Sequence, residues 1–502
     1  MKLHDWIAGH ANRTPSKVAM IDWSSGRRFT YAQMHRRVGS LAGFLAEEKN
    51  IQCGDRVAVL CDNTTDIFEI QFACARVGAV FAPLNAKLAV RELEAIIGDL
   101  APRILFHGTG YSSVAHEMLD IALVESTVEM AHGKPSGAYE TAIAYSHVIE
   151  AGEPPDVDEI WTILYTSGTT GRAKGVEVTY AMALMNAVNL APLKPSSQMV
   201  NLTFLPLFHI GGLNALANPA FLYGGTVVVM RNADPSEILA LIGRQDLGIT
   251  HFVGVPTIFQ FMAQQAAFQS TDFSQIVAAV VGGAPISAER LAVWEAAGLP
   301  LAQIYGLTET GPTALLLDPS DATGKIGSAG KPVSHISIRL VDDAGRDAAD
   351  GSIGEIWLKG PGVTPGYWRR PDVNSVEFTD GWLRTGDAAL RDAQGFYFIK
   401  DRFKNMYISG GENVYPAEVE AAILKLEEVL EVAVIGIPDE RWGETGRAFI
   451  VKKPGAALTP ECILAHCKIW LARYKHPSQI RFIDEMPHNS AGKVLKSALD
   501  RT

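Results

Sequence analysis

The sequence predicts an α/β protein whose large N-terminal domain holds two similar, parallel-type sheets covered by helices, plus a small β subdomain. Short apolar runs alternate with helical patterns through much of the first 310 residues, an order typical of parallel sheets. After about residue 325, glycines and short β-like runs replace this alternation, which indicates a small antiparallel subdomain. From Phe403 onward the pattern is that of a small α+β domain.

The first series of strands and helices precedes residue 110. Apolar runs of strand length are each followed by a segment with helical periodicity. Strands are expected at Val57–Leu60, Val80–Pro83 and Ile104–His107, and helices at Thr65–Val77 and Val90–Leu100. Such a series predicts one parallel sheet with helical crossovers.

The same alternation returns between residues 226 and 305. Asp234 fits an N-cap, and Pro235 suits the first position of the helix that follows. Strands are expected at Thr226–Met230, His251–Val255, Ile276–Val281 and Leu301–Tyr305, and helices near Thr257–Ala267 and Ser287–Ala297. Two series of one kind predict two sheets of similar construction.

The C-terminal pattern is more irregular. Pro416 is expected to begin a helix with Glu418 and Glu420 in its first turn, where acids complement the helix dipole. The other expected elements are strands at Ile336–Val341, Glu355–Leu358, Phe396–Ile399, Val432–Ile437 and Ala448–Val451, and a helix at Pro460–Ala472. We expect one domain of residues 1–402 and a second of residues 403–502.

Composition narrows the class of protein. At 502 residues the chain exceeds the size of one hydrophobic core, so at least two domains are expected. A formal net charge of −11 and the lack of a basic run argue against a nucleic-acid partner. The five cysteines form no C-x-x-C pair, which favours a reduced, cytoplasmic protein whose thiols are mostly buried. His466 beside Cys467 has no second ligand pair, so a core position is favoured over a metal site.

Two segments bear on membranes. The N-terminus lacks the long apolar stretch of a signal peptide. Residues 195–230 contain no Asp, Glu, Lys or Arg, but prolines, glycine pairs and asparagines interrupt them. A transmembrane helix of about 20 apolar residues cannot be drawn there. We therefore interpret the segment as buried interior, and peripheral contact with a membrane stays open.

The stretch Tyr165–Gly175, YTSGTTGRAKG, is the most informative feature of the sequence. Glycines let backbone N–H groups approach phosphate oxygens, hydroxyls donate hydrogen bonds, and Lys174 supplies positive charge. It is not a Walker A loop, because that pattern requires glycine before the lysine and Ser or Thr after it. The stretch predicts a polyphosphate-binding loop that follows the apolar run Ile160–Leu164.

This loop resembles the signature of the adenylate-forming superfamily, which includes acyl-CoA synthetases, luciferases and the adenylation domains of peptide synthetases. Further stretches resemble family motifs in the same order. They are GGAP (Gly282–Pro285), YGLTETGP (Tyr305–Pro312), WLRTGD (Trp382–Asp387), DRFKNMYISGGENVYPAEVE (Asp401–Glu420) and GKVLK (Gly492–Lys496). The resemblance runs from residue 165 to the C-terminus and implies ATP, Mg²⁺ and a carboxylic acid as ligands.

The resemblance also implies roles for single residues. Glu309 would bind Mg²⁺, Thr308 would contact the α-phosphate, and Lys493 would bridge the attacking carboxylate and the phosphate. The nucleotide would be held by residues of four motifs: Thr166, Ser167, Gly168, Thr169, Thr170, Gly171, Lys174, Gly282, Gly283, Ala284, Tyr305, Asp387 and Arg402. Taken without their motifs, Asp387 could be an ordinary turn residue and Lys493 a solvated charge.

The match at SGGENV (Ser409–Val414) points to coenzyme A as the acceptor. In acyl-CoA synthetases the backbone here lines a pantetheine tunnel, which implies Ser409, Gly410 and Gly411 as CoA-binding residues. Side chains at the two glycines would obstruct such a tunnel. The family alternates two orientations of a mobile C-terminal domain, and the resemblance places the hinge at Lys404. A single hinge residue can absorb such a change.

The acyl pocket is expected around His209, near the substrate carboxylate, with walls from Ile210–Gly212, Val253–Pro256 and Gly306–Leu307. A lone histidine in an apolar run is more often a core residue, and the glycine pair beside it favours a site. Amino-acid-activating relatives place an aspartate here for the substrate ammonium, which would be costly to bury unpaired. The charge-free segment therefore favours an apolar acid, fatty or aromatic.

The sequence departs from the family pattern at three places. Tyr180 stands where relatives commonly have histidine, His488–Asn489 where they often have Arg-Thr, and Lys496 where they have Arg. We expect none of these to remove the chemistry.

The resulting hypothesis is an AMP-forming acid–CoA ligase that acts on carboxylic acid, ATP and CoA, either as a monomer or as a homodimer. The alternatives are an enzyme that loads a carrier-protein thiol, a luciferase-like oxygenase and a silent nucleotide-binding protein. The intact set of Lys174, Glu309, Asp387, Arg402 and Lys493 speaks against a silent protein.

Overall fold

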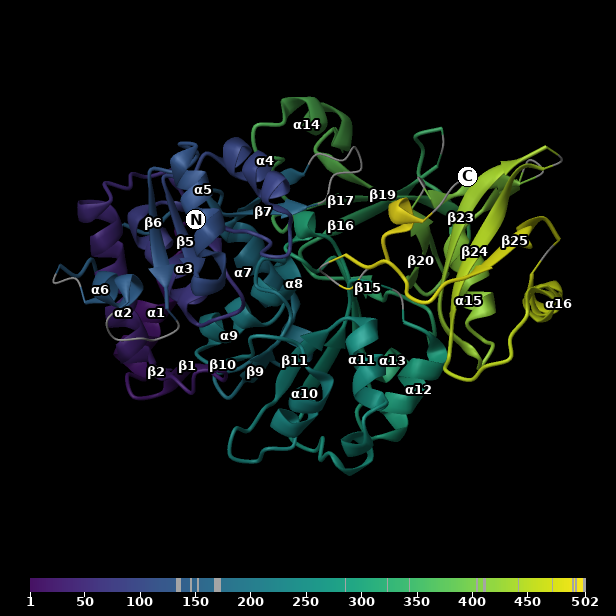
Figure 1. Ribbon diagram of the computed structural model, residues 1–502, viewed down its shortest axis with the longest axis horizontal. Helices are drawn as coiled ribbons and strands as arrows, with labels where there is room; N and C mark the ends of the chain where they lie inside the picture. Colours follow the sequence, from purple (N-terminus) through teal and green to yellow (C-terminus); the bar gives the residue numbers. More distant parts are fainter. Residues whose placement is uncertain are drawn as a thin grey trace. The chain divides into compact units, whose positions relative to one another are not determined.

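The structure is a computed structural model of the chain, and its elements are labelled in Figure 1. It describes residues 1–131, 137–144, 147–150, 153–166, 173–284, 286–322, 324–342, 344–402, 405–409, 412–440, 442–471, 473–489, 492 and 494–499, with backbone only at 401–402 and 412–413. Contacts divide it into two compact units. Unit 1 comprises Met1–Gly324, Pro332–Ser337 and Lys359–Gly381, and unit 2 comprises Lys325–Lys331, Ile338–Leu358 and Trp382–Thr502. Unit 2 groups the small β region with the C-terminal α+β fold, and the boundary expected at residue 402 stays a prediction.

The first sheet of unit 1 has the order β6-β5-β3-β4-β7-β8 and is parallel except for β8. Its strands are β3 (Arg56–Leu60), β4 (Val80–Pro83), β5 (Ile104–Gly108), β6 (Ser126–Met130), β7 (Ile160–Thr166) and β8 (Lys174–Thr179). Helices α3 (Asp66–Val77), α4 (Val90–Leu100) and α5 (Ser112–Asp120) connect the parallel strands. This series agrees with the strands and helices expected before residue 110.

From β14 to β2, the second sheet runs in the order β14-β13-β12-β11-β9-β10-β1-β2, with a parallel centre from β13 to β1. Its strands are β1 (Val18–Asp22), β2 (Arg28–Thr30), β9 (Val200–Thr203), β10 (Thr226–Val229), β11 (His251–Gly254), β12 (Ala278–Val281), β13 (Ala302–Tyr305) and β14 (Leu315–Leu317). Its outer helices are α10 (Pro235–Ile242), α11 (Pro256–Ala263) and α12 (Ala288–Ala296). Asp234 caps α10 as expected, because its carboxylate accepts from the N–H of Glu237 at 2.8 Å.

The two sheets are built alike, as the two sequence series predict. The order β6-β5-β3-β4 in the first corresponds to β12-β11-β9-β10 in the second, with the earliest strand between the same neighbours. Side chains alternate between the faces of a buried strand. In β3, Val57 and Val59 join a core shared with the second sheet, whereas Ala58 and Leu60 pack against α4 and α5.

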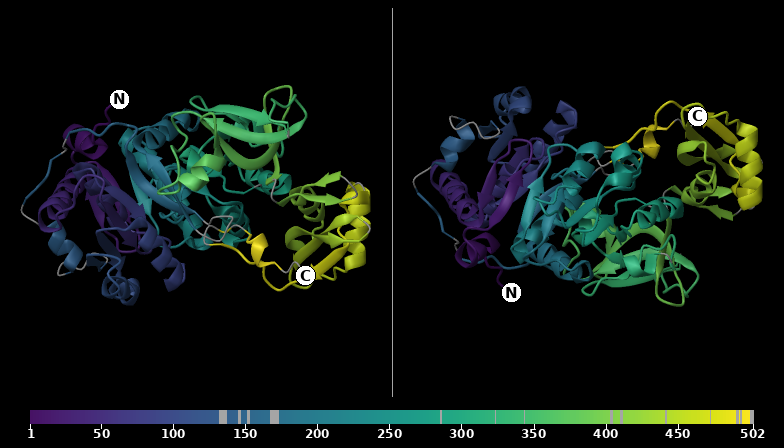
Figure 2. Two further views of the ribbon diagram at one scale, coloured as in Figure 1. Left: turned by 90° about the horizontal axis from the view of Figure 1, so that it is seen from above. Right: turned by 90° about the horizontal axis from the view of Figure 1, so that it is seen from below.

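The shared core contains residues of both sheets and of several helices. These include α1 (Trp6–Arg13), α2 (Tyr31–Gly43), α3, α7 (Tyr180–Asn189) and α9 (Ala217–Tyr223). Two further views of the ribbon, in which these helices can be found by their colour, are given in Figure 2. Residues 195–230 contribute Leu207, Leu213 and Phe221 to it. Most of the charge-free segment is thus interior, as expected, whereas Ser196, Ser197 and Gln198 are exposed.

A buried charge cluster ties α2 to α3. Arg37 pairs with Glu69 at 2.6 Å and with Glu140 at 2.9 Å, and Arg27 pairs with Asp66 at 2.8 Å. Burial raises the pKa of the Asp66 carboxyl to about 7, and the neighbouring charge of Glu69 adds to the shift. Asp66 therefore holds a proton in the folded state across a range of pH in which the unfolded chain has lost it.

Replacing Asp66 with asparagine should change the pH dependence of stability. Because the folded-state pKa lies above the unfolded value, the contribution of Asp66 is present below pH 4 and is lost as pH rises to about 7. Over this pH range, the stabilisation lost through Asp66 amounts to about 4 kcal/mol. The Tm of Asp66→Asn relative to the original protein should therefore rise between pH 4 and pH 8 in scanning calorimetry. A Tm difference that is constant with pH would contradict this assignment.

The small sheet of unit 2 contains β16 (Ser337–Val341), β17 (Ile353–Lys359), β19 (Trp382–Arg391) and β20 (Tyr397–Arg402). Strand β19 lies between β17 and β20 and is antiparallel to both. The remaining short elements of the described chain are α6 (Ala138–Ile143), α8 (Ile210–Leu213), α13 (Pro319–Ala322), β15 (Lys331–Pro332), α14 (Pro371–Glu377) and β18 (Phe378–Thr379).

The C-terminal fold of unit 2 is α+β, as expected. Its sheet contains β21 (Tyr407–Ser409), β22 (Glu412–Val414), β23 (Val429–Asp439), β24 (Gly443–Lys452) and β25 (Gln479–Phe482), and α15 (Pro416–Ile423) and α16 (Pro460–Trp470) pack on it. Glu418 lies in the first turn of α15, but Glu420 lies beyond it. Glu420 instead accepts from the N–H of Val434 and pairs with Lys496 at 2.7 Å.

Two of the three sequence departures and two expectations about cysteines can be placed here. Lys496 pairs with Glu420, and His488 lies 2.8 Å from a carboxylate oxygen of Glu431. His466 bonds through Nε2 to the carbonyl of Ala422, and no group of three His, Cys, Asp or Glu in the described chain could hold a metal. Three of the five cysteines are buried, as expected: Cys61, Cys74 and Cys467.

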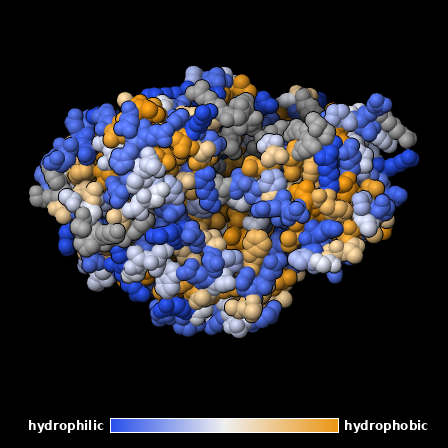
Figure 3. All heavy atoms as spheres, viewed as in Figure 1, coloured by the Kyte–Doolittle hydropathy of each residue, from blue (hydrophilic) through white to orange (hydrophobic). Residues whose placement is uncertain are grey.

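None of the described helices has both the length and the apolar character that crossing a membrane requires. On the face shown in Figure 3, hydrophobic residues occur in small groups among hydrophilic ones.

Candidate active site

Several of the predicted site residues of unit 1 lie at one edge of the second sheet, whereas Thr166 and Lys174 lie on β7 and β8 of the first. Strands β9, β11, β12 and β13 are parallel neighbours, so their carboxyl ends meet at the same edge. Ligands of α/β proteins bind at this edge. His209 follows β9 and Gly282–Ala284 follows β12, while Tyr305 ends β13 and Thr308 and Glu309 come shortly after it. The structure therefore brings together residues predicted for the acid, the adenine and the metal.

Two glycines at this edge are required by close packing. The N–H of Gly282 donates to the carbonyl of Gly254 at 3.1 Å, and a Cβ on Gly282 would lie 2.6 Å from Ile304. A Cβ on Gly306 would lie 1.7 Å from the carbonyl oxygen of Pro312. Gly283 and Ala284 are exposed, so the backbone after β12 is accessible to a ligand.

Replacing Gly306 with alanine should distort this edge. The contact is with backbone, which cannot move aside like a flexible side chain, so we expect a loss of about 3 kcal/mol in stability. We also expect about tenfold weaker ATP binding, because Tyr305 and Thr308 flank the displaced residue. Calorimetric titration measures the affinity, and Gly283→Ala, where a Cβ has 3.5 Å to Val255 but φ is +82°, separates steric from backbone effects. Unchanged affinity in Gly306→Ala would contradict the prediction.

Lys174 contacts two residues that the sequence did not predict, Glu377 and Tyr367, and Tyr367 also contacts Glu309. Lys174, the first residue of β8, is only 8% exposed, and its ammonium lies 2.9 Å from Oε1 of Glu377. The same ammonium lies 5.1 Å from the ring centroid of Tyr367, within cation–π range. The Tyr367 hydroxyl donates to Oε1 of Glu309 at 2.9 Å. The predicted phosphate ligand and the predicted metal ligand thus share one aromatic residue.

Nothing local in the sequence marks these partners. Tyr367 lies 58 residues after Glu309, and Glu377 lies 203 residues after Lys174. Thr364 is a third such residue, since its N–H donates to the Glu309 carbonyl at 2.8 Å. These contacts depend on the turn at Gly366–Tyr367 meeting β8, where Trp368 donates to the carbonyl of Gly175.

Glu309 suits a magnesium ion bound with few protein ligands. It lies in the 3-10 turn Thr308–Thr310 and is partly exposed together with Thr308. The described residues contain no group of three metal-ligating side chains, so they form no all-protein cage. Mg²⁺ typically binds through one or two carboxylates, substrate phosphates and water. The donor set at Glu309 fits that coordination.

His209 is a neutral imidazole at pH 7. Burial lowers its pKa to about 4, and the positive charge of Lys87 contributes to the shift. Its ring lies 4.6 Å from that of Phe208. A neutral imidazole can still donate one hydrogen bond to a substrate carboxylate, so His209 fits orientation rather than charge neutralisation.

The predicted residues of unit 2 are described only in part. Asp387 is buried, its N–H donates to Oγ1 of Thr385 at 3.0 Å, and it lies opposite Arg402 in the β19–β20 register. Ser409 is buried and lies opposite Glu412.

Several predicted residues of both units lie outside the described residues: Ser167, Gly168, Thr169, Thr170, Gly171, Lys404, Gly410, Gly411, Lys493 and the side chain of Arg402. Their roles stay predictions.

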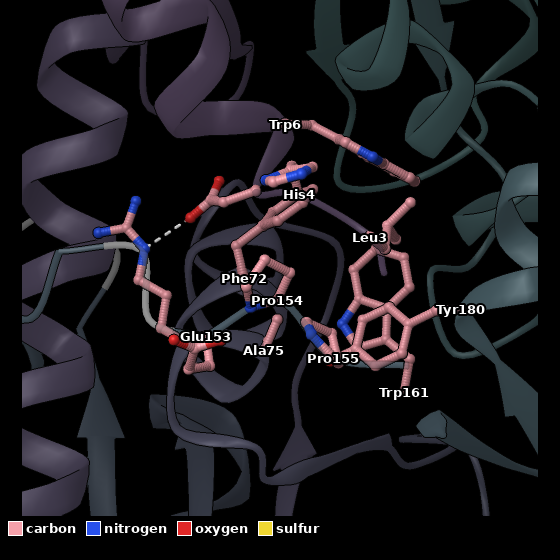
Figure 4. A pocket seen from close by; sticks show the side chains of 12 residues that line it. Leu3, His4, Trp6, Phe72, Ala75, Glu153, Pro154, Pro155, Trp161 and Tyr180 are labelled. Carbon is pink, nitrogen blue, oxygen red and sulfur yellow. Dashed lines mark hydrogen bonds and ion pairs between the residues drawn. The ribbon is translucent and has the colours of Figure 1, made fainter. Parts of the chain in front are cut away.

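Tyr180, one of the departures from the family pattern, lines a separate pocket in unit 1 (Figure 4). Figure 4 shows it beside Trp161, whose ring centroid lies 5.5 Å from that of Trp6 and 5.6 Å from that of Phe72. Tyr180 stacks on Trp161, with ring centroids 5.1 Å apart and planes 14° apart. None of the predicted site residues is among the residues lining this pocket, so Tyr180 serves packing at this position.

Comparison with known proteins decides the family. The family model described as AMP-binding enzyme matches residues 7–368, and that of the AMP-binding enzyme C-terminal domain matches residues 418–493. The chain belongs to the AMP-binding enzyme family. The resemblance proposed from the sequence is thereby confirmed.

Individual relatives of this AMP-binding enzyme match over nearly the whole chain. A feruloyl-CoA synthase from Amycolatopsis sp is 36% identical over 99% of this chain and 98% of the relative. An indoleacetate–CoA ligase from Aromatoleum aromaticum is also 36% identical, over 99% and 97%. The solved structure of O-succinylbenzoate coenzyme A synthetase from Bacillus subtilis with ATP and magnesium ion superposes with a TM-score of 0.88, at 30% identity over 99% and 100%.

These comparisons confirm the predicted α/β fold class and the predicted enzyme class, an AMP-forming acid–thiol ligase. They also confirm ATP, Mg²⁺ and coenzyme A as its ligands, and they favour CoA over a carrier protein as the acceptor.

Proposed function

We propose that this enzyme couples an apolar carboxylic acid, aromatic or fatty, to coenzyme A. The observation that carries the proposal is the charge-free segment of residues 195–230, which supplies His209 and much of the surrounding interior. An acid with an ammonium group would need a buried partner that this segment does not offer. Two of the relatives, a feruloyl-CoA synthase and an indoleacetate–CoA ligase, are named for aromatic acids, which agrees with an apolar substrate.

The first half-reaction would join the acid to the α-phosphate and release pyrophosphate. A carboxylate is already a nucleophile at neutral pH, so no general base is needed. The enzyme must hold the reactants in line and screen negative charge. His209 would orient the carboxylate, Thr308 the α-phosphate, and Lys174 the leaving phosphates, while Lys493 would bridge the reacting groups. Magnesium held through Glu309 would screen the phosphate charge.

The second half-reaction would transfer the acyl group to sulfur. The CoA thiolate would attack the acyl carbon, and the bond to the AMP oxygen would break, so that AMP leaves with the electron pair. Ser409, Gly410 and Gly411 would line the path of the pantetheine arm. A change of domain orientation about Lys404 would withdraw Lys493 and present this strand.

A panel of acids tests the proposal. Purified enzyme with MgATP should release pyrophosphate with some members of a series from acetate to palmitate that includes benzoate and cinnamate types, and it should then consume the thiol of free CoA. Pyrophosphate release without loss of CoA thiol would support a carrier-protein acceptor instead. Failure to release AMP with any acid would overturn the proposed function.

We further propose a reducing, cytoplasmic location, supported by the buried free thiols.

A further inference from the structure

Lys174 has a carboxylate partner within the protein. Its side chain is 10% exposed, whereas that of Glu377 is 31% exposed, and their charged atoms lie 2.9 Å apart. A buried ammonium requires a partner, because an unpaired charge in the interior is strongly disfavoured. Glu377 is less buried and can remain solvated without Lys174. The lysine therefore depends on the pair more than the glutamate does.

Helix α14, which ends at Glu377, is held against the turn at Gly366–Tyr367. Helix α14 carries Asn374, whose Oδ1 accepts from the N–H of Tyr367 at 2.8 Å. A Cβ on Gly366 would lie 2.8 Å from Asn374, so the turn and the helix are in close contact. Glu377, at the end of this helix, is thus held against the strand that carries Lys174.

This arrangement conflicts with phosphate binding by Lys174. A carboxylate beside the ammonium cancels the positive charge that phosphate oxygens would use. When a phosphate group binds the Lys174 ammonium, the Glu377 carboxylate has two alternatives. It moves away from Lys174, or it stays close to a triphosphate that is also negatively charged. Both alternatives weaken binding of the anion.

We infer that Glu377 is a built-in counter-ion of Lys174 that the triphosphate of ATP displaces, so that Glu377 weakens nucleotide binding and promotes release of pyrophosphate. The inference rests on the proposed function, in which Lys174 holds the leaving phosphates. Glu377 acts through Lys174 and is a positioning residue.

Calorimetric titration of MgATP and of pyrophosphate, without acid or CoA, tests the inference. Glu377→Gln keeps a hydrogen-bond acceptor for Lys174 and removes the charge, and it should bind both ligands about tenfold more tightly. Asp372→Asn is the matched control. It removes a carboxylate from the same helix that pairs with Arg370 and is 65% exposed, and it should leave both affinities unchanged.

Further measurements separate this role from a structural one. The KM for the acid should not change in Glu377→Gln, and pyrophosphate should inhibit at lower concentration. If Glu377→Gln does not fold, Glu377→Asp is the second variant. Its shorter side chain moves the carboxylate away from Lys174, so MgATP and pyrophosphate should bind about threefold more tightly. Equal or weaker binding in the folded variant overturns the inference. If the unaltered protein binds no ATP, the proposed function itself fails, whereas ATP binding that Glu377→Gln leaves unchanged overturns only the role of Glu377.

Discussion

Replacing Lys493 with alanine is expected to lower the rate of acyl-adenylate formation by about 10³-fold. The predicted role of Lys493 is to bridge the attacking carboxylate and the phosphate, where a positive charge stabilises the transition state directly. Loss of one such group typically costs 10²- to 10³-fold, roughly 3–4 kcal/mol. Thioester formation from supplied acyl-AMP should stay within about threefold, because in the proposed mechanism a different domain orientation would serve that step.

The two half-reactions must be measured separately. Pyrophosphate release reports the first, and CoA thiol consumption from synthetic acyl-AMP reports the second. Lys496→Ala is a suitable control, because Lys496 belongs to the same GKVLK motif but pairs with Glu420 at 2.7 Å. It should alter stability slightly and spare both rates. Equal losses in both half-reactions of Lys493→Ala would refute the predicted role.

The fold was largely predictable because local patterns specify its parallel sheets. The bounds of β4 and α4 agree with the sequence prediction at Val80–Pro83 and Val90–Leu100. β4 is a short apolar run and α4 is an amphipathic segment, so each has a clear local pattern. β4 also pairs with β3, which is close to it in the chain. Strand β1 is different. It pairs with β10, about 200 residues later, and local periodicity contains no information about such a partner.

The candidate site also contains residues that the sequence predicts and residues that it does not. Gly282, Tyr305 and Glu309 could be predicted from the sequence because each belongs to a continuous motif at the end of a strand. Tyr367 and Glu377 were not, because their importance comes only from contacts with distant residues. A tyrosine and a glutamate in a loop and a short helix have no distinctive pattern. Their identification required the placement of β8 beside the Gly366–Tyr367 turn.

Replacing Glu309 with glutamine should lower kcat/KM for MgATP by about 10²- to 10³-fold. The amide oxygen can still accept the hydrogen bond from the Tyr367 hydroxyl, which spans 2.9 Å in the native site. The backbone contact with Thr364 also stays. The change therefore removes mainly the negative charge that a hard divalent cation requires, and metal-assisted screening of the phosphates is worth several kcal/mol.

Binding measurements distinguish loss of the metal from a general defect. In the unaltered enzyme, ATP affinity in calorimetry should rise with Mg²⁺ concentration, and in Glu309→Gln this dependence should largely disappear. Tyr367→Phe is the matched control, since it keeps the carboxylate and removes one hydrogen-bond donor, for which a loss of about tenfold is expected.

The ranking of these two variants decides how the site works. If Glu309 binds the metal and Tyr367 only orients it, Glu309→Gln must be the more damaging change, and only that variant should lose the magnesium dependence. If Tyr367→Phe proves equally damaging while the magnesium dependence survives in both, the Tyr367–Glu309 bond would matter for the shape of the loop after β13. The metal would then require another ligand.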